Sequence, residues 1–260
     1  MVNNMNSLNR GLDIMEYIVL NKCASVSEIA QAFQINKSTA SRILAVLAEH
    51  DLVCKEGNTM KYYPSIGTLL YSSRTIANYQ ILDAIHPMLC SLAKTTNMTA
   101  QVCVLKHDAV ILLDQVKSRS NRFLKEPALP GMTEPLHCSA IGKCILAYMP
   151  EEEYLKILDN YKFTKYTSNT IVEKEKLLDE MQQIRKDGYA LDKGELYDNV
   201  FCMALPIYNE KGEVAYSVAV SGKKDFLENE KRFMFVLTEV KRIANKISEE
   251  YIAAVISEAQ

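Results

Sequence analysis

The stretch SVSEIAQAFQINKSTASRILAVLAEHDLVCKEGNTMKYYPS, residues 25–65, decides the fold of the first part of the chain. Residues 26–33 carry apolar side chains at helical spacing, and residues 34–36 interrupt the pattern. Residues 37–49 then form a second, longer amphipathic segment. A short helix, a tight break and a longer helix with a free polar face are typical of a helix-turn-helix. That motif places its second helix in the major groove of DNA.

The flanking segments complete a winged helix-turn-helix. Residues 8–20 repeat apolar side chains at helical spacing, which predicts a preceding helix. Residues 52–64 contain two strand-like runs separated by Gly57 and Asn58, a pair that favours a hairpin turn. Three helices and a hairpin therefore predict a DNA-binding domain over residues 1–65.

The polar face of residues 37–49 carries hydroxyl and cationic side chains that suit a DNA groove. A guanidinium such as that of Arg42 can form two hydrogen bonds with a guanine edge, whereas serine and lysine reach bases or phosphates. Lysines on the wing can contact the phosphate backbone of the flanking DNA. The predicted DNA contacts are Lys37, Ser38, Thr39, Ser41, Arg42, Lys55 and Lys61. The alternative is a solvated helix face on a domain that binds protein.

Charge does not by itself indicate a nucleic-acid partner. The whole chain has a formal net charge of −2, and within residues 1–65 six lysines and arginines are balanced by six acids. Each copy of the chain therefore neutralises few phosphates. We expect dimerisation, which doubles that number.

The composition is that of an ordinary globular protein of 260 residues, with 48% apolar and 24% charged residues. No apolar run approaches the roughly 20 residues needed to span a bilayer, and the N-terminus lacks the pattern of a signal peptide. We expect a cytoplasmic protein. The seven cysteines lack a Cys-x-x-Cys pair and the four histidines lack ligand spacing, so we predict neither a metal site nor a cofactor.

The second part of the chain predicts an α+β domain. Residues 66–80 form a linker helix whose apolar face could pack against a second copy, and Pro87 suits the first turn of the next helix. Strands are expected over 99–105, 109–116, 200–208 and 214–221, and helices over 139–149, 151–158, 173–186 and 228–255. An antiparallel sheet with helices packed on it then occupies residues 81–260.

Four motifs make the chain similar to a known family. They are SLNRGLDIM at 7–15, NKSTASRIL at 36–44, PLHCSAIGK at 135–143, and the spaced set Gly188-x3-Asp192-x2-Glu195-x6-Cys202-Met203-Ala204-x2-Ile207-Tyr208-Asn209. With these motifs the chain resembles the IclR family of bacterial transcriptional regulators over residues 7–247. The resemblance implies a winged helix-turn-helix joined by a linker helix to a GAF-like effector-binding domain.

The resemblance also implies a function. Family members act as homodimers or dimers of dimers on double-stranded DNA, and a small molecule, often an organic acid, changes their affinity for the operator. We expect a sequence-specific regulator that binds an inverted repeat. We expect it to be a repressor rather than an activator.

The effector pocket is placed by the same resemblance and by the chemistry of helix termini. A helix that begins after Ser139 leaves backbone N–H groups free to meet an anion. The resemblance puts the amides of Ala140 and Ile141 and the side chains of Asp192, Cys202 and Ser221 at the effector. Each has a simpler interpretation: Cys202 can be a core residue, Asp192 can cap a turn, and Ser221 can end a strand.

Two further functions compete with this one. A Cys-His hydrolase could use Cys138 or Cys202 with His137, but no nucleophile elbow, P-loop or dinucleotide fingerprint is present. We therefore predict that the protein is not an enzyme. A winged-helix regulator that acts through protein contacts is the second alternative.

Overall fold

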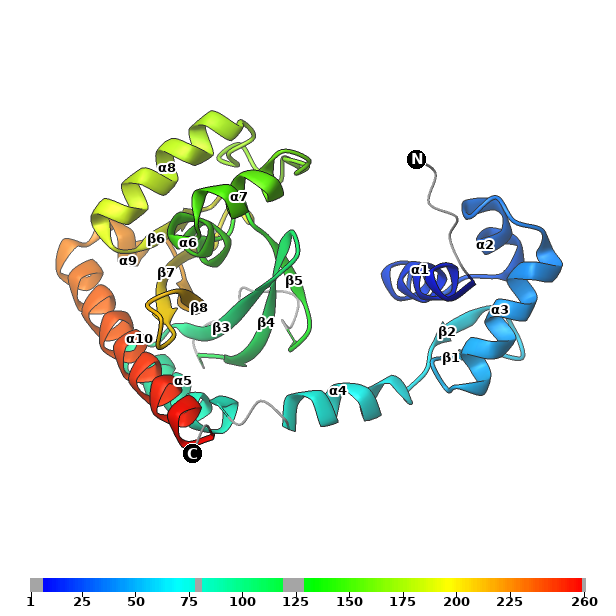
Figure 1. Cartoon of the computed structure of the whole chain (residues 1–260). Helices are drawn as coiled ribbons and strands as arrows, with labels where there is room; N and C mark the ends of the chain where they lie inside the picture. The colour runs from blue at the N-terminus through cyan, green and yellow to red at the C-terminus, as the bar shows by residue number, and fades with distance from the viewer. Residues whose placement is uncertain (1–6, 78–80, 119–128, 259–260) are drawn as a thin grey trace. The chain divides into compact units, whose positions relative to one another are not determined.

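The computed structural model describes residues 7–77, 81–118 and 129–258 and divides the chain into two compact units (Figure 1). The first unit is Met1–Tyr79 and the second is Gln80–Gln260. None of the helices in the described ranges is long and apolar enough to cross a membrane.

The first unit contains the predicted three helices and hairpin, followed by one more helix. Its elements are α1 (Ser7–Leu20), α2 (Val26–Ala32), α3 (Lys37–Glu49), β1 (Val53–Lys55), β2 (Tyr62–Pro64) and α4 (Thr68–Ala77). Strands β1 and β2 pair antiparallel, and Ala24 adds an isolated bridge to Tyr62. A small core of Ile14, Ile18, Ile29 and Leu44 holds α1, α2 and α3 together.

Helix α4 is shorter than the expected 66–80 segment and exposes its apolar side chains. Leu69 and Leu70 are 57% and 63% exposed, and Tyr71 is 61% exposed. Residues 78–80 lie outside the described part of the chain.

The second unit is built on a six-stranded antiparallel sheet in the order β5-β4-β3-β8-β7-β6. The strands are β3 (Thr99–Lys106), β4 (Ala109–Val116), β5 (Thr133–Pro135), β6 (Ala190–Lys193), β7 (Phe201–Tyr208) and β8 (Val214–Gly222). The helices are α5 (Ile81–Thr96), α6 (Ala140–Tyr148), α7 (Glu151–Leu158), α8 (Lys174–Asp187), α9 (Asp225–Glu228) and α10 (Glu230–Glu258).

Helices cover both faces of this sheet. Helices α5 and α10 run side by side on one face, where Ile85, Leu89 and Val240 are fully buried against the strands (Figure 1). Helices α6 and α8 pack on the other face around Leu146 and Leu177. The predicted α+β fold with an antiparallel sheet is confirmed.

The position of Pro87 corrects the sequence prediction. Pro87 lies inside α5, which begins at Ile81 rather than next to the proline. An interior proline costs a helix about 3 kcal/mol because it lacks an N–H and crowds the preceding turn. The turns before and after it bury Ile81, Ile85 and Leu89 on one face, at about 1.5–3 kcal/mol for each side chain. Burial of this face therefore outweighs the defect.

The sequence prediction also missed three short elements, which are β5, β6 and α9. Strand β6 matters most because it forms one edge of the sheet and carries Asp192.

Candidate functional site

Helix α3 presents its polar face outward because its apolar stripe is buried. Ala40 and Leu44 are fully buried in the core of the first unit, and Leu47 is nearly so. Asn36 caps the helix: its Oδ1 accepts hydrogen bonds from the backbone N–H of Thr39 at 2.7 Å and from the hydroxyl of Ser38 at 2.8 Å. The cap fixes the first turn, where the positive end of the helix favours a phosphate.

The structure gathers five of the seven predicted DNA-contacting residues on α3. Lys37, Ser38, Ser41 and Arg42 are exposed, whereas Thr39 is half-buried. This face carries two cations and three hydroxyls, a set that can bind phosphates and base edges.

The two wing lysines differ from each other. Lys55 is exposed on β1, with its Nζ 5.8 Å from the ring centre of Tyr62. Lys61 is half-buried and its Nζ lies 3.5 Å from Oε1 of Glu28 on α2. Glu28 also closes the capping box of α2 by accepting a hydrogen bond from the N–H of Ser25 at 2.7 Å. The ion pair between Lys61 and Glu28 therefore links the wing to α2, whereas the Lys55 side chain is exposed to solvent.

In the second unit a cavity of about 490 Å³ is lined by residues from all six strands of the sheet. Asp192, Cys202 and Ser221 line it from β6, β7 and β8. The register brings them into one row, since Asp192 pairs with Cys202 and Cys202 pairs with Ser221. Directly paired residues project from the same face of a sheet, so the three side chains meet in one wall.

Most of the other polar residues around this cavity are uncharged. They are Gln101, Gln115, Thr133, Tyr166, Thr167, Tyr197 and Asn199. The ionisable carboxyls are those of Glu134, Asp192 and Asp198, and no lysine or arginine occurs among the described residues of the lining. An anion in this cavity would therefore be held by neutral donors.

Burial changes the ionisation of the acids in this wall. Asp192 is only 2% exposed, and burial raises the pKa of its carboxyl to about 7, although the N–H of Glu195 donates to Oδ1 at 2.6 Å and opposes the rise. Burial also raises the pKa of Glu134. A neutral Asp192 can donate a hydrogen bond, which an ionised carboxylate cannot.

The first residues of α6 are not part of the described cavity lining. Ala140 and Ile141 are buried in the core cluster under the sheet, and their residues are not among those that line the cavity. Ser139 caps the helix by accepting a hydrogen bond from the N–H of Gly142 at 3.0 Å. A Cβ at Gly142 would lie 2.5 Å from Cα of Leu136, so only glycine allows this close approach.

Lys143, a buried lysine that the sequence did not point to, forms ion pairs with two acids. Lys143 on α6 is fully buried, with Nζ 2.5 Å from Oε1 of Glu195 and 3.2 Å from Oε1 of Glu180. Burial raises the pKa of Glu195, and Lys143 opposes that rise. Because Glu195 also donates its N–H to Asp192, this ion pair fixes the loop that carries the cavity wall. Lysines are usually exposed, so the burial of Lys143 could not be expected from the sequence.

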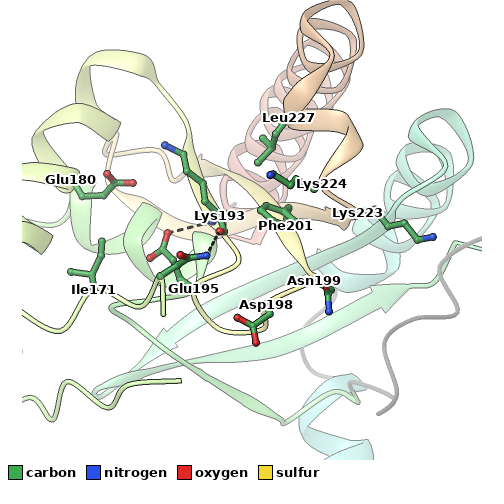
Figure 2. A pocket seen from close by; sticks show the side chains of 11 residues that line it. Ile171, Glu180, Lys193, Glu195, Asp198, Asn199, Phe201, Lys223, Lys224 and Leu227 are labelled. Atoms are coloured by element: carbon green, nitrogen blue, oxygen red, sulfur yellow. Dashed lines mark hydrogen bonds between the residues drawn. The ribbon is translucent and has the colours of Figure 1, made fainter. Parts of the chain in front are cut away.

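A second, larger cavity of about 1020 Å³ shares Asp198 and Asn199 with the first. It is lined by charges of both signs, among them Lys193, Lys224, Glu180 and Asp198, and Figure 2 shows these side chains together with Glu195. Three of the five residues of the predicted effector site, Asp192, Cys202 and Ser221, line the smaller cavity, so we assign the candidate ligand site there.

The thiol and imidazole groups of the hydrolase alternative do not form a catalytic pair. Both ring nitrogens of His137 are engaged: Nδ1 lies 3.0 Å from the hydroxyl of Tyr161 and Nε2 lies 2.9 Å from the carbonyl oxygen of Thr164. Burial raises the pKa values of Cys138 and Cys202 well above the usual range, which keeps both thiols neutral. Within the described part of the chain, no hydrogen bond joins His137 to either cysteine, so it does not activate them there.

Both units match models of known protein families. The family described as bacterial transcriptional regulator IclR C-terminal matches residues 73–249, and the IclR helix-turn-helix domain matches residues 7–57. The chain is 30% identical over 216 residues to the HTH-type transcriptional regulator BhcR of Paracoccus denitrificans, which covers 83% of this chain and 77% of BhcR.

Two further proteins support the same relationship. The HTH-type transcriptional repressor AllR of Escherichia coli K12 is 28% identical over 243 residues, which covers 93% of this chain and 89% of AllR. The crystal structure of the Thermotoga maritima IclR superposes with a TM-score of 0.70 at 29% identity, over 95% of this chain and 99% of that chain. On these matches, which span both units, the chain belongs to the IclR family of bacterial transcriptional regulators.

Proposed function

We propose that this regulator binds a specific operator in double-stranded DNA through α3, and that a small organic acid in the 490 Å³ cavity changes its affinity for that operator. The proposal rests on the presence of two features in one chain: α3 has an exposed polar face, and the second unit contains a polar cavity. In this account the first unit reads DNA and the second unit senses a metabolite in the cytoplasm.

On α3 we assign base reading to Arg42 and phosphate contacts to Lys37 and the first turn. The guanidinium of Arg42 suits a guanine edge, and the exposed hydroxyls of Ser38 and Ser41 suit bases or phosphates. Lys55 would contact the flanking backbone. Lys61 would contribute less, because Glu28 already compensates part of its charge.

In the cavity we assign the acid to the row formed by Asp192, Cys202 and Ser221. The wall supplies hydroxyl and amide donors, and Asp192 adds a carboxyl that burial keeps about half protonated at pH 7. Ala140 and Ile141 do not line the cavity, and we keep their amides in the proposal only as backbone donors, since first-turn N–H groups have no acceptor within their own helix. The cavity volume suits a small molecule rather than a peptide.

We further propose that the protein acts as a homodimer or a dimer of dimers on an inverted repeat. The exposed Leu69, Leu70 and Tyr71 of α4 and the exposed Leu8 and Leu12 of α1 give apolar faces that a second copy could cover. Two copies would present two α3 helices to two half-sites. Repression is the direction we favour, because AllR is a repressor.

The test is fluorescence anisotropy of the full chain on labelled DNA from upstream of its own gene, beside a scrambled duplex, at two salt concentrations. We expect selective binding that weakens with salt, and a change in affinity when short aliphatic or benzoate-type acids are added. A Ser221→Val variant, which removes one hydroxyl from the cavity wall, should bind the DNA normally and respond less to the acid. A regulator that works through protein contacts would show no selectivity for any duplex.

A further inference from the structure

Helix α5 carries a cysteine beside a histidine that is held by a carboxylate. Sγ of Cys90 lies 3.6 Å from Nε2 of His86, one helical turn away. Nδ1 of the same imidazole lies 2.7 Å from Oδ2 of Asp114 on β4. The proposed DNA and effector sites use none of these three residues.

The carboxylate determines which nitrogen of His86 can accept a proton. A carboxylate oxygen accepts a hydrogen bond, so Nδ1 carries the hydrogen that is donated to Asp114. Nε2 then has a free lone pair, and this lone pair faces the thiol of Cys90. A thiol, a base within reach and a third group that orients the base form the arrangement that activates a nucleophile.

The environment favours reaction with a small reagent from solution. Cys90 is exposed, and the side chain of His86 is 57% exposed. Within the described residues no group of histidine, cysteine and acidic side chains has the arrangement of a metal site. Cys103, Cys138 and Cys144 are buried, and burial raises the pKa of Cys144 to about 12. Those thiols are both shielded and neutral.

We propose that Cys90 is a modification site for carbon electrophiles of the α,β-unsaturated carbonyl class. The sulfur of Cys90 forms a bond to the β-carbon of the reagent while its proton moves to Nε2 of His86. The π electrons of the reagent shift to the α-carbon, which then takes the proton back from His86. The product is a thioether, and no oxidant, reductant or leaving group is involved.

The site is connected to the wall of the ligand cavity through β4. Asp114 and Gln115 are adjacent, and Oδ1 of Asp114 accepts a hydrogen bond from the N–H of Gln115 at 2.8 Å. The Gln115 side chain lines the cavity and donates to Oε1 of Gln101 at 3.1 Å. Three successive hydrogen bonds, through His86 and Asp114, therefore link Cys90 to Gln115 in the cavity wall.

The test uses acrylamide as the electrophile on the full chain, with mass spectrometry of each cysteine peptide over time. Cys54 is a matched reference because it is also exposed, and no hydrogen bond of its side chain is found among the described residues. We expect Cys90 to be alkylated about tenfold faster than Cys54, a modest part of what a positioned base contributes. His86→Gln should lower the Cys90 rate to that of Cys54, and Asp114→Asn should lower it because the imidazole is no longer oriented.

The control variant is His107→Gln, which changes another exposed histidine in the β3–β4 turn and should leave the Cys90 rate unchanged. Protection of Cys103, Cys138 and Cys144 in the same digest reports whether the second unit remains folded in each variant. Equal rates at Cys90 and Cys54, or a Cys90 rate that His86→Gln does not change, would overturn the proposal.

Discussion

At the scale of single residues, the exposed cations of the first unit separate base reading from phosphate binding. We expect Arg42→Ala to cost about 1–3 kcal/mol of operator binding with a much smaller effect on random DNA, because a bidentate guanine contact is lost. Lys55→Ala should weaken binding to both duplexes and reduce the slope of affinity against salt by about one ion. Anisotropy titrations over a salt series measure both effects. An equal loss on both duplexes for Arg42→Ala would make it a phosphate contact only.

Asp192 gives a pH-dependent prediction for stability. The usual pKa of the carboxyl is 3.8 and the folded protein raises it to about 7, so the folded state holds a proton that the unfolded state releases between these values. Stability from this group is therefore present below pH 3.8 and is lost as the pH rises toward 7, by about 1.4 kcal/mol for each pH unit at most.

The isosteric Asp192→Asn variant removes this titration and can keep the hydrogen bond from the N–H of Glu195. Its stability advantage over the natural protein should grow from about pH 4 to about pH 7 and then level off. Urea unfolding across that range tests this, with Asp108→Asn as a control, because Asp108 is exposed in the β3–β4 turn. An Asp192→Asn curve parallel to that of the natural protein would contradict a raised pKa.

At the scale of elements, the capping of α3 links stability to DNA reading. Asn36 accepts two hydrogen bonds in the first turn, one from a backbone N–H and one from Ser38. Asn36→Ala should lower the free energy of unfolding of the first unit by about 0.5–2 kcal/mol, while Asn36→Asp should retain the cap. Thermal unfolding of the three proteins measures the difference. If alanine and aspartate behaved alike, the cap would not contribute.

The elements also show how far the sequence determines the fold. The wing and the two helices before it follow from apolar spacing and from the Gly57-Asn58 turn, which are local features. Pro87 was misplaced because the burial that sustains α5 across it depends on a sheet distant in sequence. Strands β5 and β6, of three and four residues, are too short to give a clear alternation.

The cavity was predictable only in part, for the same reason. Asp192, Cys202 and Ser221 were placed through family resemblance, and the antiparallel register explains their common wall. Gln101 and Gln115 were missed because they pair with each other across β3 and β4, and β3 joins the rest of the wall only by pairing with β8, a pairing that no local pattern reveals. Lys143 was missed because its burial depends on partners from two later segments, Glu180 and Glu195.

At the scale of the whole molecule, the proposal requires the two units to be coupled. If an organic acid changes operator affinity by some factor, the operator must change the affinity for the acid by the same factor. Calorimetric titration of the acid into the protein with and without saturating operator measures this factor independently of anisotropy. If the acid changed DNA binding but bound the protein equally well with and without operator, binding at the two sites would not be coupled.

The central claim is that α3 reads a specific sequence, and selection from a random duplex library tests it most directly. The full chain and its Arg42→Ala variant would each be used to enrich the library, and the bound DNA would be sequenced after successive rounds. We expect the natural chain to enrich an inverted repeat and the variant to lose preference at one position in each half-site. If the natural chain enriched no sequence under conditions in which it binds DNA, α3 would not read sequence.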